Sequence, residues 1–279
     1  MVEVVTWSSA DVARVLRMPT DGDDKYSRGV VGLRTGSTEY PGAAVLGVEA
    51  AWRTGVGMVR YLGPSRDLVL ARRPETVTAD GRVHAWVIGS GTDPSTRSRA
   101  ETGALRAILA RTEPVIVDAG ALDLALGASA PVIVTPHDRE HARLREGLHL
   151  SGAPEDRTAA AVETASALDA VVLLKGSSTL VATPDGLVLR VDAGVPWLAT
   201  AGTGDVLAGA IGALVAAAGA GNAPADAASL AAHAASGAWL HARAGAIASA
   251  AYGSAGGPIT AMDVAEALPR AVGEVLAER

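Results

Sequence analysis

The sequence predicts an α/β protein built on a central, mostly parallel sheet. Short apolar runs suited to buried strands alternate with longer segments whose apolar residues recur at helical spacing. The first strand–helix–strand unit consists of a strand at 29–33, a helix opened by Pro41 and a strand at 57–62. Units of this kind build parallel sheets. Polar or glycine motifs follow most of the strands, at the edge where open α/β sheets bind ligands.

The remaining elements continue this alternation. Ser8 and Asp11 have the spacing of a capping box for a first helix that reaches residue 16. Pro184-Asp185-Gly186 joins two short apolar runs, 180–182 and 187–191, which we expect as a hairpin at the sheet's edge. Further strands are predicted at 83–88, 114–118, 131–137 and 170–174. Further helices are predicted at 95–110, 157–168, 205–218, 225–244 and 260–276.

Composition narrows the range of functions. No repeat, linker or charge block divides the 279 residues, so we expect one domain over 1–279. A net charge of −6 without a basic face argues against nucleic-acid binding, and the lack of cysteine excludes thiolate catalysis and Cys-ligated zinc. We expect a cytoplasmic protein, because no apolar leader opens the chain and the Ala-rich run at 211–220 is broken by glycines and too short for a bilayer.

The segment with the clearest chemical character is Gly202-Thr203-Gly204-Asp205, which precedes an apolar helix. Loop glycines let backbone N–H groups converge, and a helix start adds free amides and positive partial charge, so the segment suits a phosphate. An acid at that place would repel a phosphate unless it had separate work, such as taking a proton from an attacking hydroxyl. The sequence therefore predicts a phosphate site with Asp205 as a base.

Lys175 is the second candidate. It is one of only two lysines among 24 basic residues, and it follows an apolar strand and precedes Gly176-Ser177-Ser178-Thr179. A compact ammonium on a thin stem suits a tight phosphate site, although a lysine at a strand end can also simply reach for solvent. His137 also follows a strand. Two interpretations stay open for it: a residue that lines a pocket, or a residue of a surface loop. No complete Walker or dinucleotide fingerprint occurs, and no spacing indicates a metal site, so the metal ligands stay unknown.

Several blocks, spread from about residue 24 to 278, carry a family resemblance. They are Tyr40-Pro41-Gly42-Ala43-Ala44, the segments 87–91, 117–122 and 199–209, Thr135-Pro136-His137, and Leu174-Lys175-Gly176 with Ser178-Thr179. In these blocks the chain resembles the ADP-dependent NAD(P)H-hydrate dehydratases, a stand-alone branch of the ribokinase-like superfamily. The resemblance implies a three-layer α/β/α sandwich with a mostly parallel sheet, and no N-terminal epimerase domain.

The resemblance also implies an activity: ADP phosphorylates the ring hydroxyl of hydrated NADH or NADPH in its S form, and loss of phosphate returns NAD(P)H with AMP. It implies that magnesium takes part, that ADP or ATP is the co-substrate, and that a separate NAD(P)HX epimerase and a homotetramer are to be expected, without nucleic acid or membrane as partners. Implied contacts to the hydrated dinucleotide are Ala43, Gly91, His137 and Asp205. Implied contacts to the adenine nucleotide are Lys175, Gly176, Ser177, Ser178, Thr179 and Gly204, with Gly202, Thr203 and Gly204 as the anion hole.

The chain departs from the usual family pattern at four places. Ala201 replaces a common glycine, Ser90 a proline, Gly120 a frequent second aspartate, and Asp138-Arg139 a Pro-Gly pair. None of these removes a residue expected to be catalytic, although Gly120 bears on metal or water placement.

Two other functions stay open on the sequence alone. One is a ribokinase-like kinase that uses ATP on a small alcohol such as a vitamin precursor. The other is a non-catalytic adenine-nucleotide-binding protein, which would gain nothing from the acid at Asp205. The sequence does not distinguish NADH from NADPH forms, or ADP from ATP.

Overall fold

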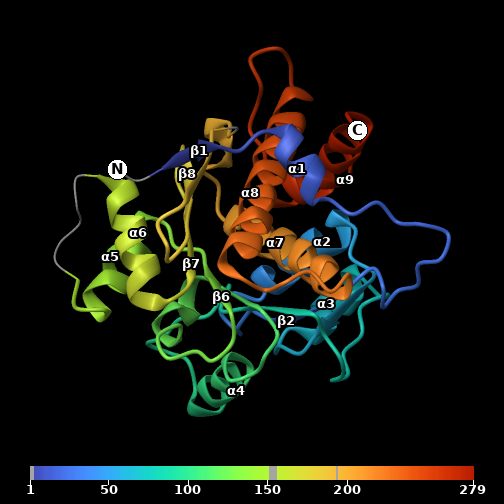
Figure 1. Cartoon of the computed structure of the whole chain (residues 1–279). Coiled ribbons are helices and arrows are strands. Elements are labelled where there is room, and N and C mark those ends of the chain that lie inside the picture. The colour runs from blue at the N-terminus through green and yellow to red at the C-terminus, as the bar shows by residue number, and fades with distance from the viewer. Residues whose placement is uncertain (1–2, 151–155, 193) are drawn as a thin grey trace.

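A nine-stranded sheet forms the centre of the computed structural model, which describes residues 3–150, 156–192 and 194–279 (Figure 1). The strands lie in the order β1-β9-β8-β7-β6-β5-β4-β2-β3, and every pairing is parallel except those of β8 with its two neighbours. The strands are β1 Val4–Thr6, β2 Val30–Arg34, β3 Met58–Tyr61, β4 Ala85–Ile88, β5 Val115–Val117, β6 Val132–Val134, β7 Val171–Leu174, β8 Thr179–Ala182 and β9 Val188–Val191. The predicted fold class is thereby confirmed.

Helices cover both faces of the sheet, which explains why its central strands are apolar without alternation. On one face Val87, Ile116 and Leu173 pack under α2, α7 and α8; on the other, Val117 and Leu174 pack under α4, η1, α5 and α6. Helices α1 and α9 pack outside α7 and α8. The helices are α1 Ser9–Val15, α2 Gly42–Thr54, α3 Arg66–Arg72, α4 Arg99–Leu109, η1 Ala119–Leu124, α5 Asp138–Gly147, α6 Arg157–Leu168, η2 Pro196–Leu198, α7 Thr203–Ala220, α8 Ala227–Ala250 and α9 Ala261–Ala277.

The structure differs at several elements from what the sequence predicts. The strand predicted at 131–137 ends at Val134, because Pro136 cannot donate to the ladder and His137 already caps α5. Neither α3 nor α5 was predicted. The hairpin β8–β9 exists, but it is not the edge of the sheet, since β1 adds a further strand beside β9. Helix α4 begins only at Arg99, after the capping residue Ser98.

The Ala-rich helix α7 is longer than the run seen in the sequence, and its glycines do not interrupt it. A Cβ on Gly209 would stand 2.2 Å from the carbonyl oxygen of Gly47, so these two glycines let α7 and α2 approach closely. By length and composition α7 is the one helix of the described chain that could cross a membrane, with a mean hydropathy of 1.5. Because 67% of it is buried in the protein, its apolar character is accounted for by the core.

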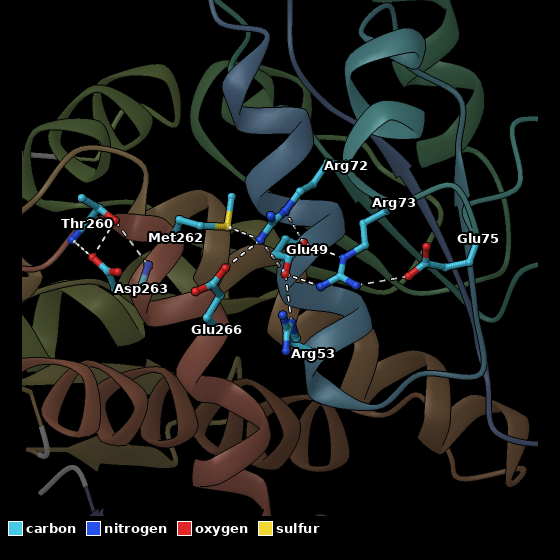
Figure 2. A network of polar contacts seen from close by, with 9 residues as sticks. All are labelled: Glu49, Arg53, Arg72, Arg73, Glu75, Thr260, Met262, Asp263 and Glu266. Atoms are coloured by element: carbon cyan, nitrogen blue, oxygen red, sulfur yellow. Dashed lines mark hydrogen bonds and ion pairs between the residues drawn. The ribbon is translucent and has the colours of Figure 1, made fainter. Parts of the chain in front are cut away.

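A buried carboxylate fixes α2 to its neighbours (Figure 2). The Glu49 side chain is fully buried and accepts hydrogen bonds from Arg53 at 2.9 Å, Arg72 at 3.2 Å and Arg73 at 2.6 Å. Arg72 also bonds Glu266 of α9 at 2.7 Å, so the network joins α2, α3 and α9. Burial opposes the charged form of Glu49, but the arginines outweigh it and the pKa of this carboxyl is lowered.

Replacing Glu49 by Gln should therefore destabilise the protein. The variant keeps the shape of the side chain but removes the anion that three guanidinium groups share. Because these groups are partly exposed, and Arg72 and Arg73 keep Glu266 and Glu75 as partners, we expect a loss of about 2 kcal/mol, below the range for fully buried pairs. Urea unfolding at pH 7 measures it, and the difference should shrink as acid protonates Glu49 itself. Glu75→Gln, which removes only an exposed contact to Arg73, is the control. Equal losses in the two variants would contradict a special role for Glu49.

Candidate active site

Two cavities meet at the C-terminal edge of the sheet, where the sequence placed the polar motifs. The first has a volume of about 890 Å³ and is lined from the segments 39–46, 91–94, 119–126, 140–148 and 201–205. The second has a volume of about 680 Å³ and is lined from 137–138, 175–179, Val191, 194–200, 203–207 and 238–242. Asp205 lines the first cavity, whereas its neighbour Gly204 lines the second. The first turn of α7 therefore forms the border between them.

The N-terminus of α7 has the features of an anion site. Gly202 begins the helix with a φ of +89°, a left-handed conformation that favours glycine, and a Cβ there would stand 2.6 Å from Leu46. No side chain caps this end, and the Thr203 hydroxyl instead donates to the carbonyls of Leu198 at 3.0 Å and Thr200 at 2.9 Å. The first-turn amides and the positive end of the helix dipole thus have no side-chain cap, and the anion hole at Gly202, Thr203 and Gly204 stays a prediction.

Asp205 lies in this first turn and has an unusual proton affinity. Burial, and then the nearby charge of Asp118, raise the pKa of its carboxyl to about 7, while Lys175 acts in the opposite direction. A carboxylate with this pKa is a far better proton acceptor at neutral pH than an ordinary aspartate. Such a shift beside a cavity is typical of a functional site.

Lys175 reaches the border from the end of β7. Its Nζ donates to Asp118 Oδ1 at 2.9 Å and lies 3.7 Å from Glu140 Oε2. Burial opposes its charged form, but Asp118 and Glu140 outweigh it, so the pKa of Lys175 is raised and the side chain stays cationic. Asp118 is itself buried and accepts from the hydroxyls of Ser90 at 2.9 Å and Thr135 at 2.7 Å.

The loop that follows Lys175 is held by α5 and α6. Arg157 donates to the carbonyls of Lys175 and Ser178, each at 3.0 Å, and its Nε lies 3.0 Å from Asp138 Oδ1. The Lys175 amide donates to Pro136 at 2.9 Å. Lys175, Gly176, Ser177 and Thr179 line the second cavity, but the Ser178 hydroxyl donates to Asp192 at 2.6 Å and does not line it.

The structure gathers most, though not all, of the residues predicted to contact the dinucleotide. Ala43 and Gly91 line the first cavity with Asp205, and they lie against each other, since a Cβ on Gly91 would meet the Ala43 Cβ at 2.5 Å. His137 lines the second cavity instead. Its Nδ1 accepts from the amides of Arg139 and Glu140, which makes it the cap of α5. The ligand contacts of all these residues stay predictions.

Three of the four departures from the family pattern have local explanations. Ser90 supplies a hydroxyl to Asp118 that a proline lacks. A Cβ on Gly120 would stand 2.0 Å from the Thr92 carbonyl oxygen, so an aspartate does not fit there in this backbone. Asp138 pairs with Arg157, which in turn holds the loop after Lys175. Ala201 simply lines the first cavity.

Sequence reasoning missed three residues of this site. It placed Asp118 at the sheet edge without giving it a role, and it did not single out Glu140 or Arg157. Glu140 is the third residue of α5 and completes a capping box with His137, a signal that was hidden because α5 itself was not predicted. Arg157 gave no signal, since its partners are distant in sequence.

The described part of the chain does not form a magnesium cage by itself. It contains no group of three or more His, Asp or Glu side chains arranged to hold a metal. Besides Asp205, the carboxylates near the border are Asp118 and Glu140, and both face the Lys175 ammonium. A Mg²⁺ ion here would depend on ligands that arrive with the substrate.

The raised pKa of Asp205 has a cost in stability that can be measured. Because the folded carboxyl binds its proton more tightly than the unfolded one, stability falls as the pH rises from about 4 to about 7. Asp205→Asn avoids this loss, so the variant should be more stable than the parent by roughly 4 kcal/mol at pH 8, with no gain below about pH 4. Urea unfolding at both pH values tests it, with the exposed Asp67→Asn as control. A gain that is the same at both pH values would refute the assignment.

Comparison with known proteins places this architecture in a family. A model of the NAD(P)H-hydrate dehydratase family matches residues 31–270. The bifunctional NAD(P)H-hydrate repair enzyme Nnr of Mycobacterium tuberculosis is 45% identical over 228 residues, which are 77% of this chain and 46% of that protein; the chain thus matches less than half the length of such relatives. The ADP-dependent (S)-NAD(P)H-hydrate dehydratase of Neisseria meningitidis is 36% identical over 87% of this chain and 85% of its own length.

A solved structure agrees with these relatives. The ADP/ATP-dependent NAD(P)H-hydrate dehydratase of Bacillus subtilis, co-crystallised with ATP and Mg²⁺, has a TM-score of 0.80 and 26% identity to this chain, over 97% of it and 98% of the solved chain. Sequence and structure thus point the same way. The chain belongs to the NAD(P)H-hydrate dehydratase family.

Proposed function

We propose that this protein repairs hydrated NADH and NADPH by ADP-dependent dehydration of the S form, releasing NAD(P)H, AMP and phosphate. The observation that carries the proposal is the placement of Asp205, a carboxylate with a pKa of about 7, at the border of two cavities and in the first turn of an uncapped helix. One cavity takes the hydrated dinucleotide and the other the adenine nucleotide. The names of the relatives support the same activity.

The chemistry follows from this arrangement. The hydrated nicotinamide lies in the first cavity, against Ala43 and Gly91, with its ring hydroxyl directed at Asp205. Asp205 accepts the hydroxyl proton as the oxygen attacks the terminal phosphorus of ADP, and the bond to AMP breaks with its electron pair leaving on AMP. The amides of 202–204 and the Lys175 ammonium stabilise the charge on the transferring group. The phosphorylated ring then loses phosphate and a ring proton, which restores the reduced nicotinamide.

Magnesium enters this proposal with the nucleotide. The Bacillus subtilis relative was co-crystallised with ATP and Mg²⁺, and Mg²⁺ would neutralise phosphate charge when bound. Because Asp118 and Glu140 already face Lys175, we propose that the phosphates and water supply most of its ligands. Homo-oligomeric assembly, a separate epimerase, a single domain over 1–279 and a cytoplasmic location stay predictions of the sequence.

The direct test is turnover of hydrated NADH with ADP, followed by recovery of the reduced-nicotinamide absorbance. Asp205→Asn should lower kcat by about 10²- to 10⁴-fold, the range for a lost general base, while the Kd for ADP from calorimetry changes little. Asp67→Asn controls for loss of an acidic residue and should match the parent. Unchanged turnover in Asp205→Asn would sink the proposed role. Accumulation of a phosphorylated vitamin precursor from ATP would favour the kinase alternative instead.

The pH dependence of turnover is a separate prediction. Only the deprotonated carboxylate can take a proton, so kcat/KM should fall on the acid side with a midpoint near the Asp205 pKa of about 7. An ordinary aspartate would place that limb near pH 4. Initial rates from pH 5 to 9, corrected for the acid lability of the substrate in enzyme-free samples, decide between the two.

A further inference from the structure

The proposed reaction does not account for one feature of the site: Lys175 pairs with Asp118 and not with Asp205. We propose that Asp118 is a positioning residue which holds Lys175 away from Asp205 and so preserves Asp205 as a base. The inference rests on the proposed function for the role of Asp205, but its geometry and its main test do not. The mechanism itself gives the buried Asp118 carboxylate no role.

Asp118 is held more firmly than any other charged group at the border. It follows β5, its side chain is almost completely buried, and each carboxylate oxygen has a fixed partner. Ser90 Oγ donates to Oδ2 at 2.9 Å, whereas Thr135 Oγ1, at 2.7 Å, and Lys175 Nζ, at 2.9 Å, share Oδ1. A buried network with all of its members satisfied is rigid. The Lys175 ammonium is therefore bound to a stationary anion.

Lys175 has an alternative partner within reach. Its Nζ lies 3.5 Å from the point where a Cβ of Gly204 would stand, so the ammonium is beside the first turn of α7, next to Asp205. Its ion pairs among the described residues are nevertheless with Asp118 and Glu140. A flexible lysine stem allows a small swing toward α7, and the strong bond to Asp118 is what opposes it.

A direct pair between Lys175 and Asp205 would impair the base. An ammonium in contact with a carboxylate stabilises the anion and lowers its pKa by about one to three units, which weakens it as a proton acceptor. Lys175 would also be turned from the second cavity, where the phosphates are expected. Asp118 avoids both effects while keeping the positive charge at the border.

The other charged groups around the pair do not replace Asp118. Glu140 Oε2 lies 3.7 Å from Lys175 Nζ, but it also accepts from the His137 amide at 2.8 Å, and its other oxygen faces the His137 ring at 3.5 Å. His241 of α8 is close enough to influence Lys175, yet burial lowers its pKa to about 4, so it is neutral at pH 7. Of the carboxylates that pair with Lys175, Asp118 makes the shorter contact, and its side chain is almost completely buried.

The test is a double-mutant cycle on the protein without ligands, read by ¹³C NMR titration of the Asp205 carboxyl. The signal is assigned by its loss in Asp205→Asn. Asp118→Asn keeps the shape of the side chain, and we expect it to lower the Asp205 pKa by about one unit or more, because a like charge is lost and Lys175 is released. In a Lys175→Met background only the first effect remains, so the shift should be less than half as large.

Equal shifts in the two backgrounds would show that Asp118 acts through its charge alone, and would overturn the positioning role. An unchanged Asp205 pKa in Asp118→Asn would overturn it as well. Asp67→Asn is the matched control and should leave the titration where it is. If Asp118→Asn does not fold, Ser90→Ala takes its place in the cycle: it loosens Asp118 without changing its charge, and a smaller shift in the same direction is expected.

Turnover provides an independent readout. In Asp118→Asn, kcat should fall about tenfold or more and the acid limb of the pH profile should move below 7 together with the NMR midpoint. A merely structural defect would lower kcat and leave the limb in place. If the parent protein shows no ADP-dependent turnover, the proposed function fails, whereas the NMR cycle still decides the role of Asp118.

Discussion

The ion pair between Lys175 and Asp118 joins the two halves of the site. It links the end of β7 to the end of β5, two strands that are not neighbours in the sheet, across the end of β6 and its Thr135 hydroxyl. Because parallel strands end at the same edge, side chains from three consecutive strands converge there without any loop having to fold back. The ion pair thereby helps to fix the positions of the two cavities relative to the first turn of α7.

The position of α7 is set by packing and not by its polar residues. Gly209 and Gly47 let α7 and α2 approach until backbone meets backbone, and the Glu49 network then fixes α2 to α3 and α9. Asp205 thus stands on a buried helix whose neighbours are tied down at several points. A rigid support of this kind allows the Asp205 carboxylate to be held at a border where its own solvation is poor.

Much of this architecture could be predicted from the sequence, and the failures have physical causes. The strands were visible because both faces are covered, which makes them short continuous apolar runs. Helix α5 was hidden because its buried side chains include His141 and Arg145, which break the apolar period. Local sequence motifs identified Asp205 and Lys175 as candidate site residues. The Asp118–Lys175 contact did not, since it spans 57 positions in the sequence and depends on the sheet order.

At the border, three carboxylates surround the Lys175 ammonium, and this balance of charge affects any ligand that brings negative charge. Without ligands, one cation, Lys175, faces Asp118, Glu140 and Asp205, and the surplus of carboxylates helps to raise the Asp205 pKa. An anion entering the second cavity would add further negative charge and compete for Lys175, which would favour protonation of Asp205 still more. In the proposed reaction, the proton taken from the ring hydroxyl would therefore be held more tightly once the nucleotide is bound. By thermodynamic linkage, such an anion would bind more weakly once Asp205 has lost its proton, so anion binding and the proton affinity of Asp205 are coupled through the same lysine.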